Sequence, residues 1–451
     1  MSETFNLLDT RITFYVIMNV SFCLATSCWI AGLFVTHRYL FIKPSMLLLA
    51  FSHVFFQCPL ALYSGYYEQF LPDPYAFALL VHAYMIMGLL VSVFTYRRSA
   101  ESAWNQITDP RLLDNAVSMR AVVFTTSLVA CVVAAYLAYV PFKSTGLYAI
   151  FATPSLAAEA REKSLKLLDS QTLQYAYSLM VSSVAPLLAV MLGVLLLKGW
   201  RKRDFVKFSL HIIFLFLLMF SVSMTGARIS AVNLILVIAI AFVFSKGLPF
   251  QPLKLSLLII FLLLPPTMLS ILREGKAVGL GTVFEYLEYL ARRAFIMPLD
   301  TGSLYVHYAQ THSPWGISAI PKLAAILGIA PINAPNLIGL TYTNTTVAST
   351  SAGAGYLFTY YGYFGLASVL FSMIGIWVLD VALLVYVRLG SAMILPCVSA
   401  VSLAILAFIS SDYTVVWLTH GFGVILLLSW LLDHFIAPSG FDLRPRTARS
   451  V

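Results

Sequence analysis

Long apolar stretches separated by polar connections dominate this chain of 451 residues. Each stretch approaches the roughly 20 residues that an α-helix needs to cross a hydrocarbon layer about 30 Å thick. A membrane β-barrel would show alternating segments of roughly 10 residues instead. The pattern predicts an all-α polytopic membrane protein with about 11 (10–12) transmembrane helices in a single integral membrane domain, residues 1–451. The predicted spans are Ile12–Phe34, Ser45–Tyr63, Tyr75–Thr95, Ala121–Val140, Leu173–Leu197, Phe205–Met224, Ile229–Phe244, Leu255–Leu272, Gly355–Val387, Ala392–Ser410 and Val415–Leu432.

The composition excludes other classes of protein. Hydrophobic residues make up 60% of the chain and charged residues only 10%, against roughly 25% charged residues in a soluble domain. This balance excludes a soluble enzyme, a disordered chain and a fibrous protein. The net charge is +9, but the basic residues lie in short clusters between apolar runs, so we expect membrane lipids and no nucleic acid as partners.

The distribution of these basic residues predicts the orientation in the membrane. Most of the 28 Lys and Arg residues follow the first, third, fifth, seventh and ninth spans or lie in the C-terminal tail. Short connections rich in Lys and Arg stay in the cytoplasm. We therefore expect a cytoplasmic C-terminus and, with eleven spans, an N-terminus on the outer side.

Two long connections then face outward. The first runs over about residues 141–172, and its middle, Ser155–Leu168, has the spacing of an amphipathic helix. The second runs over about residues 273–354 and contains FEYLEYLARRAFIM at Phe284–Met297, which predicts a helix at the membrane surface. Loops of this length are usually functional, so we expect the protein to work on its outer side.

Four arginines on that side are candidates for binding an anion. Arg228 stands in SVSMTGAR, a tight turn between two spans, where the positive-inside rule disfavours a cation. Arg273, Arg292 and Arg293 belong to the second long connection. A planar guanidinium group contacts two phosphate oxygens at once, so converging arginines would form a phosphate site. An arginine at the bilayer edge that only reaches towards water is the simpler alternative for each.

The second long connection also contains candidate bases. His307 and His312 can act as bases near neutral pH. No HExxH, DxD or phosphate-loop pattern is present, so we expect neither a metal nor another cofactor. We interpret the cysteines as small hydrophobic residues without disulfides or a metal spacing. They are Cys23, Cys28, Cys58, Cys131 and Cys397.

The end of the second connection is polar but almost uncharged. It reads TYTNTTVASTS and then AGAGYLFTYYGYFG. Hydroxyl groups, the Asn344 amide and aromatic rings such as those of Tyr342 and Tyr360 are groups that bind sugars. A loop that enters the aromatic belt of a membrane interface has a similar composition, so this second interpretation stays open.

Three segments together carry a family resemblance. TGARISAVNLILVIAIAF, at residues 225–242, resembles the Gly-Ser/Thr-Arg motif that opens a span in Wzy-type O-antigen polymerases and the related ligases. YLARRAFIMP, at residues 289–298, is similar to a segment in the large periplasmic loop of Wzy-type polymerases. The run from Asn344 to Gly365 resembles the loop-to-span pattern that follows it, so the likeness covers most of residues 221–370.

The resemblance implies polymerisation of undecaprenyl-pyrophosphate-linked oligosaccharides, as both donor and acceptor, at the periplasmic face of the bacterial inner membrane. It also implies a metal-independent glycosyltransferase with an all-helical fold of the lipid-linked-donor type, and a chain-length regulator protein as a partner. The four arginines would then stabilise the pyrophosphate leaving group. The acceptor hydroxyl would need a base, and the candidates are His307, His312, Glu288 and Asp300.

Three alternatives remain open at this stage. An O-antigen ligase performs the same chemistry with a lipid A-core acceptor. A lipid-linked oligosaccharide flippase would bury its cations in a central cavity and would not need the second long connection. A structural membrane partner of a polysaccharide assembly complex is the third alternative.

Overall fold

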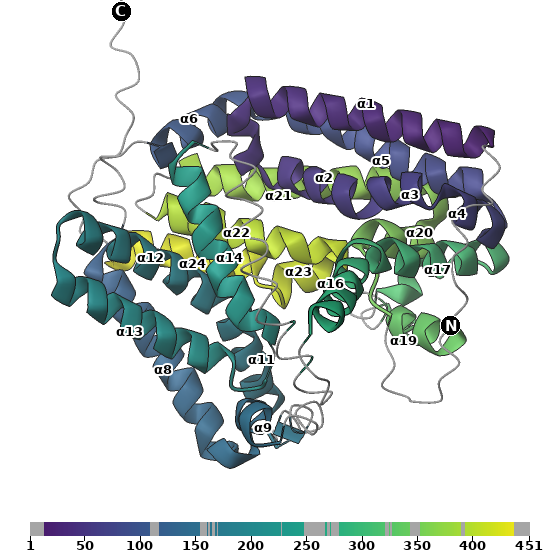
Figure 1. Ribbon diagram of the computed structural model, residues 1–451. Helices are drawn as coiled ribbons and strands as arrows, with labels where there is room; N and C mark the ends of the chain where they lie inside the picture. Colours follow the sequence, from purple (N-terminus) through teal and green to yellow (C-terminus); the bar gives the residue numbers. More distant parts are fainter. Residues whose placement is uncertain are drawn as a thin grey trace, which may run out of the picture. The chain divides into compact units, whose positions relative to one another are not determined.

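A computed structural model describes most of the chain as helices, and we found no strand among the residues it describes. These residues are 13–108, 117–153, 160, 163–164, 167–168, 170–226, 228–247, 267, 271, 279–320, 324, 327–342, 352–388 and 393–436. They divide into two compact units (Figure 1). Unit 1 comprises Met1–Thr95, Ala291–Asp380 and Phe408–Tyr413, and unit 2 comprises Tyr96–Leu290, Val381–Ala407 and Thr414–Val451.

Within the described residues, eight helices are long and apolar enough to cross a membrane, which confirms an all-helical, multi-pass architecture. They correspond to eight of the predicted spans. Two further predicted spans are the shorter apolar helices Ser230–Ser245 and Ile394–Ile409, and Leu255–Leu272 lies almost wholly outside the described residues. The count of eleven therefore stays a prediction. The eight are Phe14–Thr36, Pro44–Leu62, Pro74–Phe94, Met119–Tyr139, Gln171–Arg201, Phe205–Val222, Tyr356–Val387 and Tyr413–Phe435.

Unit 1 contains the first spans and most of the second long connection. In its N-terminal part, α1 lies along α5 and along the continuous helix formed by α2, the π-helix η2 and α3 (Figure 1). Asp73 caps the start of α5 by accepting a hydrogen bond from the Ala76 amide, and Thr13 caps α1 through the Val16 amide. The helices of this part are α1 (Phe14–Thr36), α2 (Pro44–Ser52), η2 (His53–Gln57), α3 (Cys58–Leu62), α4 (Ser64–Phe70) and α5 (Pro74–Phe94).

The described part of the second long connection is largely helical, and the helix predicted over Phe284–Met297 corresponds to α16 (Leu280–Phe295). Its helices in unit 1 are α17 (Met297–Thr311), α19 (Ala334–Tyr342) and the 3₁₀ turn η6 (Gly316–Ala319). The span that follows is not one straight helix, because Gly365 has a positive φ of 59°. It consists of α20 (Tyr356–Phe364), η7 (Gly365–Ala367) and α21 (Ser368–Arg388). α17 packs on α20, where a Cβ atom at Gly302 would lie 2.4 Å from the Phe358 ring.

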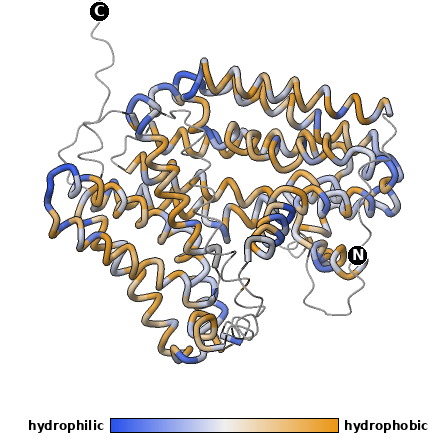
Figure 2. The backbone as a smooth tube through the Cα atoms, in the orientation of Figure 1, coloured by the Kyte–Doolittle hydropathy of each residue, from blue (hydrophilic) through white to orange (hydrophobic). Residues whose placement is uncertain are grey.

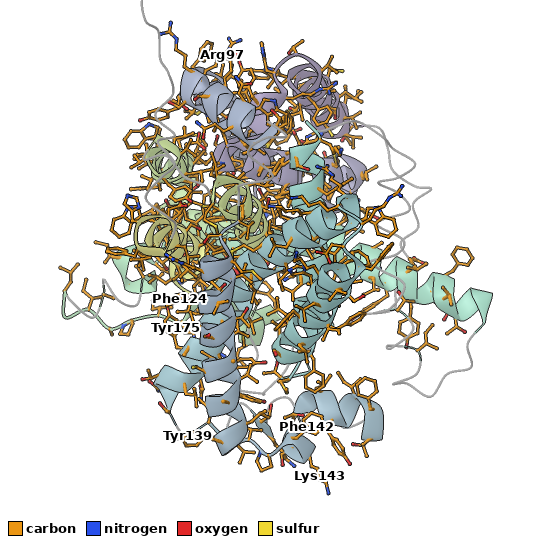
Figure 3. All side chains as sticks on the ribbon, turned by 90° about the vertical axis from the view of Figure 1, so that its left-hand side faces the viewer. Arg97, Phe124, Tyr139, Phe142, Lys143 and Tyr175 are labelled. Carbon is orange, nitrogen blue, oxygen red and sulfur yellow. The ribbon has the colours of Figure 1, made fainter. Side chains whose placement is uncertain are left out.

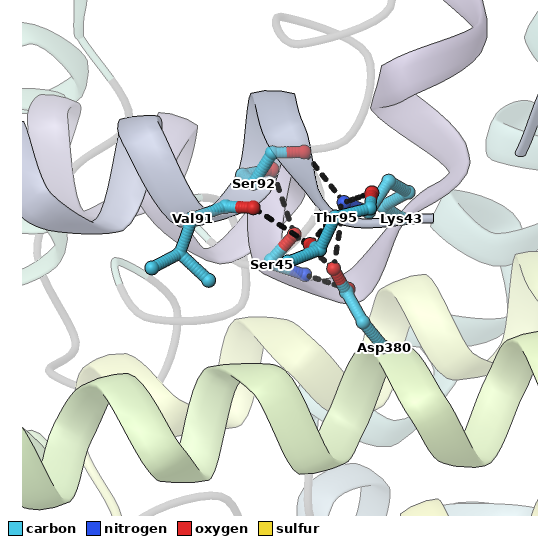
Figure 4. A network of polar contacts seen from close by, with 6 residues as sticks. All are labelled: Lys43, Ser45, Val91, Ser92, Thr95 and Asp380. Atoms are coloured by element: carbon cyan, nitrogen blue, oxygen red, sulfur yellow. Dashed lines mark hydrogen bonds and ion pairs between the residues drawn. The ribbon is translucent and has the colours of Figure 1, made fainter. Parts of the chain in front are cut away.

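A buried polar network joins the second, third and ninth predicted spans of unit 1 (Figure 4). The Lys43 ammonium lies 2.8 Å from the Asp380 carboxylate, and neither side chain is exposed. Ser45 donates to the same carboxylate from its backbone amide at 2.9 Å and from its hydroxyl at 2.7 Å. Lys43, expected in a cytoplasmic connection, is thus paired inside the unit with a residue far along the chain.

Unit 2 is built around α12 (Ala185–Arg201), which contacts several other helices. α22 (Ile394–Leu406) is buried along its whole length and packs on α12 and α14. The remaining helices of this unit are α6 (Arg97–Thr108), α8 (Met119–Tyr139), α9 (Gly146–Ala152), α11 (Gln171–Leu179), the π-helix η5 (Met180–Val184), α13 (Phe205–Val222), α14 (Arg228–Ser245), most of α16 (Leu280–Phe295), α23 (Tyr413–Leu418) and α24 (Phe422–Leu431).

The two ends of unit 2 carry different connections. Arg97, at the start of α6, lies at one end, and Phe142 and Lys143, which follow α8, lie at the other (Figure 3). The two connections thus lie at opposite ends of the unit, and the side of the membrane that each one faces stays a prediction. The helix predicted over Ser155–Leu168 falls mainly outside the described residues, and the described helix of this connection is α9.

Two of the candidate membrane helices, α1 and α13, are the least covered by protein among the eight. Only 22% of the most apolar stretch of α1 and 17% of that of α13 is buried inside the molecule. On α13, Phe205, Val206 and Phe216 are each at least 65% exposed. In Figure 2 both helices are coloured mainly as hydrophobic along their length. Apolar surface of this extent on a water-soluble protein would aggregate, so these helices are suited to contact lipid.

Candidate functional site

Three of the predicted bases lie on or next to α17 in unit 1. Pro298 stands in the first turn of this helix, where its fixed φ is compatible with helix initiation. Asp300 and His307 are seven residues apart, which places them two turns apart on one face. His312 follows the last helical residue.

Asp300 lies against α4. The Tyr67 hydroxyl, on a fully buried side chain, donates a hydrogen bond of 2.6 Å to the Asp300 carboxylate. Burial raises the pKa of Asp300 above its ordinary value, and the hydrogen bond from Tyr67 and the positive charge of Arg292 act in the opposite direction. The charge of Arg292 thus acts on the carboxyl group of Asp300, and the two residues were predicted to have different roles.

His307 belongs to a second contact on the same helix face. Its Nδ1 atom lies 2.6 Å from the Tyr342 hydroxyl, and its ring stacks on Phe70 with centroids 5.1 Å apart. Partial burial, with a smaller contribution from the nearby His312, lowers the pKa of His307 below the ordinary value of a histidine. His307 is therefore neutral at pH 7 and able to accept a proton.

His312 has different surroundings. Its ring stacks on Tyr308 with centroids 4.0 Å apart, and its Nδ1 atom lies 2.9 Å from the Thr311 hydroxyl. The side chain is exposed. The contacts of His312 are thus with residues at the C-terminal end of α17. The ring of His307, in contrast, contacts residues of α4 and α19.

Aromatic rings surround this part of unit 1. Trp315 packs near Tyr305 and Tyr308 and donates a backbone hydrogen bond of 3.1 Å to the Gly362 carbonyl. Tyr360, a predicted sugar-binding residue, is partly exposed, and its ring centroid lies 5.9 Å from that of Tyr363. Tyr342, the second such residue, contacts His307.

The remaining predicted residues are exposed or lie wholly or partly outside the described residues. Glu288, Arg292 and Arg293 are exposed on α16, where Glu288 and Arg292 stand one turn apart as predicted. Arg273 and Asn344 lie outside the described residues. Arg228 is the first residue of α14, but its side chain is not among those described.

The turn before Arg228 is closely packed in unit 2. α13 ends at Val222, and the Gly226 amide donates to the Ser223 carbonyl at 2.7 Å. Gly226 has a φ of +79°, which favours glycine. The backbone of the first outward connection touches this turn, since the Leu147 amide donates to the Met224 carbonyl at 3.1 Å.

This close approach predicts an effect of adding a single methyl group. A Cβ atom at Gly226 would lie 2.9 Å from the Gly146 carbonyl carbon. We expect Gly226→Ala to destabilise the protein by about 2 kcal/mol, because a left-handed backbone conformation costs an alanine roughly 1–2 kcal/mol and the neighbouring backbone must move. Thermal unfolding in detergent measures the effect. Gly32→Ala is the matched control, since nothing lies within 4 Å of that position on α1, and equal melting temperatures for the two variants would contradict the prediction.

A cavity lined by both polar and apolar groups lies beside this turn, within unit 2. Its volume is about 480 Å³, within the roughly 300–1,000 Å³ range of ligand pockets. Thr225 and Ser230 contribute to it from either side of Arg228 in the sequence, and Asn233 contributes from the next turn of α14. The other lining residues are Gln174, Tyr177, Ser178, Val181, Ser182, Pro186, Leu403, Ala404, Ala407 and His420.

None of these lining residues was predicted as a site residue. Gln174, Asn233 and His420 come from three separate parts of the chain, so their convergence cannot be seen in the sequence. Their only sequence signal is the presence of polar groups in or next to apolar spans, which is costly in a membrane and often functional.

Two arrangements therefore result, one in each unit, and predicted site residues take part in the first. α17 of unit 1 joins Asp300 with Tyr67 and His307 with Tyr342. In unit 2, Thr225 and Ser230 on either side of Arg228 line a cavity of mixed polar and apolar character. Comparison with protein-family models, curated proteins and solved structures yields no match to this chain.

Proposed function

We propose that this chain polymerises undecaprenyl-pyrophosphate-linked oligosaccharide repeat units at the periplasmic face of the bacterial inner membrane. The proposal includes the eleven spans and the resemblance to glycosyltransferases that use lipid-linked donors. Its chemical basis is transfer of a glycan from a lipid pyrophosphate to a hydroxyl group of the next lipid-linked unit. Such transfer passes through an oxocarbenium-like state, and charge on the leaving pyrophosphate must be stabilised.

The cavity beside the Arg228 turn, which is lined by both polar and apolar groups, is the observation that carries this proposal. Arg228 opens α14, so the positive end of the helix dipole and a guanidinium group occur at the same position. The cavity next to it presents hydroxyl and amide groups from Thr225, Ser230 and Asn233, which suit sugar and phosphate oxygens. We assign the donor pyrophosphate to this turn.

We assign activation of the acceptor hydroxyl to His307. This residue has a neutral imidazole, whereas the Asp300 carboxylate already accepts a hydrogen bond from Tyr67. The partly exposed rings of Tyr360 and Tyr342 supply apolar faces of the kind on which sugars pack. The two assignments are tested by separate variants.

Incubation of the purified protein with lipid-linked repeat units alone tests the proposed function. A ladder of polymers is expected on gel electrophoresis. Transfer only after addition of lipid A-core would instead indicate a ligase. Movement of the lipid between leaflets without bond formation would indicate a flippase, and either result would contradict the proposal.

A pH profile tests the assignment of the base. If His307 must be neutral to accept the proton, the polymerisation rate falls as the pH decreases through its lowered pKa. We expect His307→Gln to reduce the rate by roughly 10²–10⁴-fold and to remove this acidic limb. His312→Gln is the matched control and should leave both nearly unchanged. An intact acidic limb in His307→Gln would exclude His307 as the base.

Reporter fusions test the proposed sidedness. A fusion after Lys202, in the turn between α12 and α13, is expected in the cytoplasm. A fusion within residues 311–322, after α17, is expected in the periplasm. A cytoplasmic location for the second fusion would exclude His307 from a periplasmic reaction.

A further inference from the structure

Two cysteines and a histidine from two predicted spans meet inside unit 1. Cys23 belongs to α1, His53 begins the π-helix η2, and Cys58 begins α3. Their potential ligand atoms all lie within 4.8 Å of one another. The Cys23 and Cys58 sulfurs are 3.7 Å apart, and the Cys58 sulfur is 3.6 Å from Nε2 of His53. The two sulfurs are not bonded to each other, since the S–S bond of a disulfide is about 2.05 Å long.

The distances match those between ligands of one tetrahedral zinc ion. Zn–S bonds of about 2.3 Å separate two sulfurs by about 3.8 Å in a tetrahedral site. A Zn–N bond of about 2.0–2.1 Å separates sulfur and nitrogen by about 3.6 Å. The separations of 3.7 Å and 3.6 Å match these values, and the third, between the Cys23 sulfur and His53, is within 4.8 Å.

The hydrogen bonds of His53 direct its metal-binding nitrogen towards the sulfurs. Nδ1 of His53 lies 2.8 Å from the Gln57 amide oxygen, so Nδ1 carries the proton and Nε2 keeps its lone pair. A ligating histidine commonly donates its other ring N–H to an oxygen in this way. Nε2 also lies 2.8 Å from the Ser27 hydroxyl, which can donate its proton to Nε2 or to the Cys23 carbonyl at 2.9 Å. A zinc ion bound to Nε2 would leave the carbonyl as the acceptor of this proton.

A buried chain of hydrogen bonds holds Gln57 in this orientation. Its amide nitrogen donates to Nδ1 of His82 at 2.9 Å and lies 3.2 Å from the Thr26 hydroxyl. Nε2 of His82 in turn donates to the Asn19 amide oxygen at 2.8 Å. These hydrogen bonds between side chains of α1, η2 and α5 thus determine which ring nitrogen of His53 carries the proton. Nδ1 of His53 is the donor, and Nε2 keeps its lone pair.

The backbone also favours a dedicated site. His53 to Gln57 form a π-helical turn between α2 and α3, which places His53 and Cys58 near each other, five residues apart. π-helical turns inside α-helices are rare and frequent at functional sites. Cys23 lies near the middle of α1 and His53 near the middle of Pro44–Leu62. Polar groups at this depth are costly unless they have a function.

We infer that Cys23, His53 and Cys58 bind one zinc ion that joins α1 to the α2–α3 helix. Charge favours zinc over copper(I), because two thiolates neutralise Zn²⁺ and a neutral complex is the least costly in a medium of low dielectric constant. Two thiolates with copper(I) would leave a net negative charge. The fourth position belongs to the Ser27 hydroxyl oxygen or to water. This inference is independent of the proposed polymerase activity.

Metal analysis of the full-length protein tests the inference. The protein is purified in detergent under reducing conditions with Zn²⁺ as the only added metal, and bound metal is measured by mass spectrometry. We expect about one zinc per chain, and loss of that zinc in Cys23→Ser, Cys58→Ser and His53→Ala. Cys28→Ser, on the exposed side of α1, is the matched control and should retain it. Gln57→Ala should weaken zinc binding by roughly 10–100-fold through His53.

Thiol alkylation of the unmodified chain provides a test that does not depend on variants folding. Zinc should protect Cys23 and Cys58 from alkylation, and a chelator should restore their reactivity, while Cys28 and Cys131 react in both cases. Equal reactivity of Cys23 and Cys58 with and without zinc would overturn the inference. So would a Cys23–Cys58 disulfide in the freshly purified protein, or stoichiometric copper(I) without zinc.

Discussion

Lys43→Met is expected to destabilise unit 1 by about 3–5 kcal/mol, because it leaves the Asp380 carboxylate buried without its counter-ion. Methionine has nearly the length of lysine, so the variant removes the charge and leaves no large cavity. The network in Figure 4 also loses the donor that Lys43 supplies to the Thr95 carbonyl at 2.9 Å. Thermal unfolding in detergent and the yield of folded protein measure the effect.

Two controls separate the charge from the packing. Asp380→Leu alone should be similarly harmful, but Lys43→Met with Asp380→Leu should recover most of the stability, because an apolar pair replaces an ion pair. Lys207→Met removes an ion pair of the same length, 2.8 Å to Asp204, from an exposed site. Its expected effect is less than about 1 kcal/mol. A double variant no more stable than Lys43→Met would mean that the network is needed for its hydrogen bonds.

Arg228→Ala is expected to reduce polymerisation by roughly tenfold to hundredfold, because each lost charged hydrogen bond costs about 1.5–3 kcal/mol. Arg228→Lys keeps the charge but loses the planar group that contacts two phosphate oxygens, so it should restore little of the activity. The length distribution and rate of polymer ladders measure the effect. Protein yield and melting temperature should stay unchanged.

Arg201→Ala, at the exposed C-terminal end of α12, is the control for loss of a cation from the same unit and should leave the ladders normal. Near-normal ladders from Arg228→Ala would show that this arginine has no contact with the leaving group. The pyrophosphate site would then be sought at Arg292 and Arg293, and α17 would become the more informative target.

The sequence was a reliable guide to the helices whose apolar pattern extends over a membrane thickness. The predicted run Ile12–Phe34 corresponds to α1 and Tyr75–Thr95 to α5, each with boundaries shifted by one or two residues. Lipid imposes this pattern along each helix separately, so no knowledge of neighbouring helices is needed. Helix breaks were harder to see. Gly365 interrupts one predicted span through a positive φ, which the apolar composition around it conceals.

The candidate site was only partly predictable. We predicted Asp300, His307 and Tyr342 as site residues from their residue types and from their position in an outward connection. It did not show that α17 would carry the first two on one face, or that Tyr67 and Tyr342 would be their partners. These contacts depend on the packing of α4, α17 and α19, which are short helices without a distinctive pattern in the sequence.

The sequence by itself determined that the chain is helical, that several helices are long enough to cross a membrane, and where most of these lie. These properties follow from local hydrophobicity. Tertiary structure alone decided which polar groups meet. From the sequence alone, Lys43 is interpreted as a cation of a cytoplasmic connection and Cys58 as a small hydrophobic residue. Packing pairs the first with Asp380 and places the second 3.7 Å from Cys23. A buried polar group needs a partner in space, and nothing in the free energy of pairing requires that partner to be near in sequence.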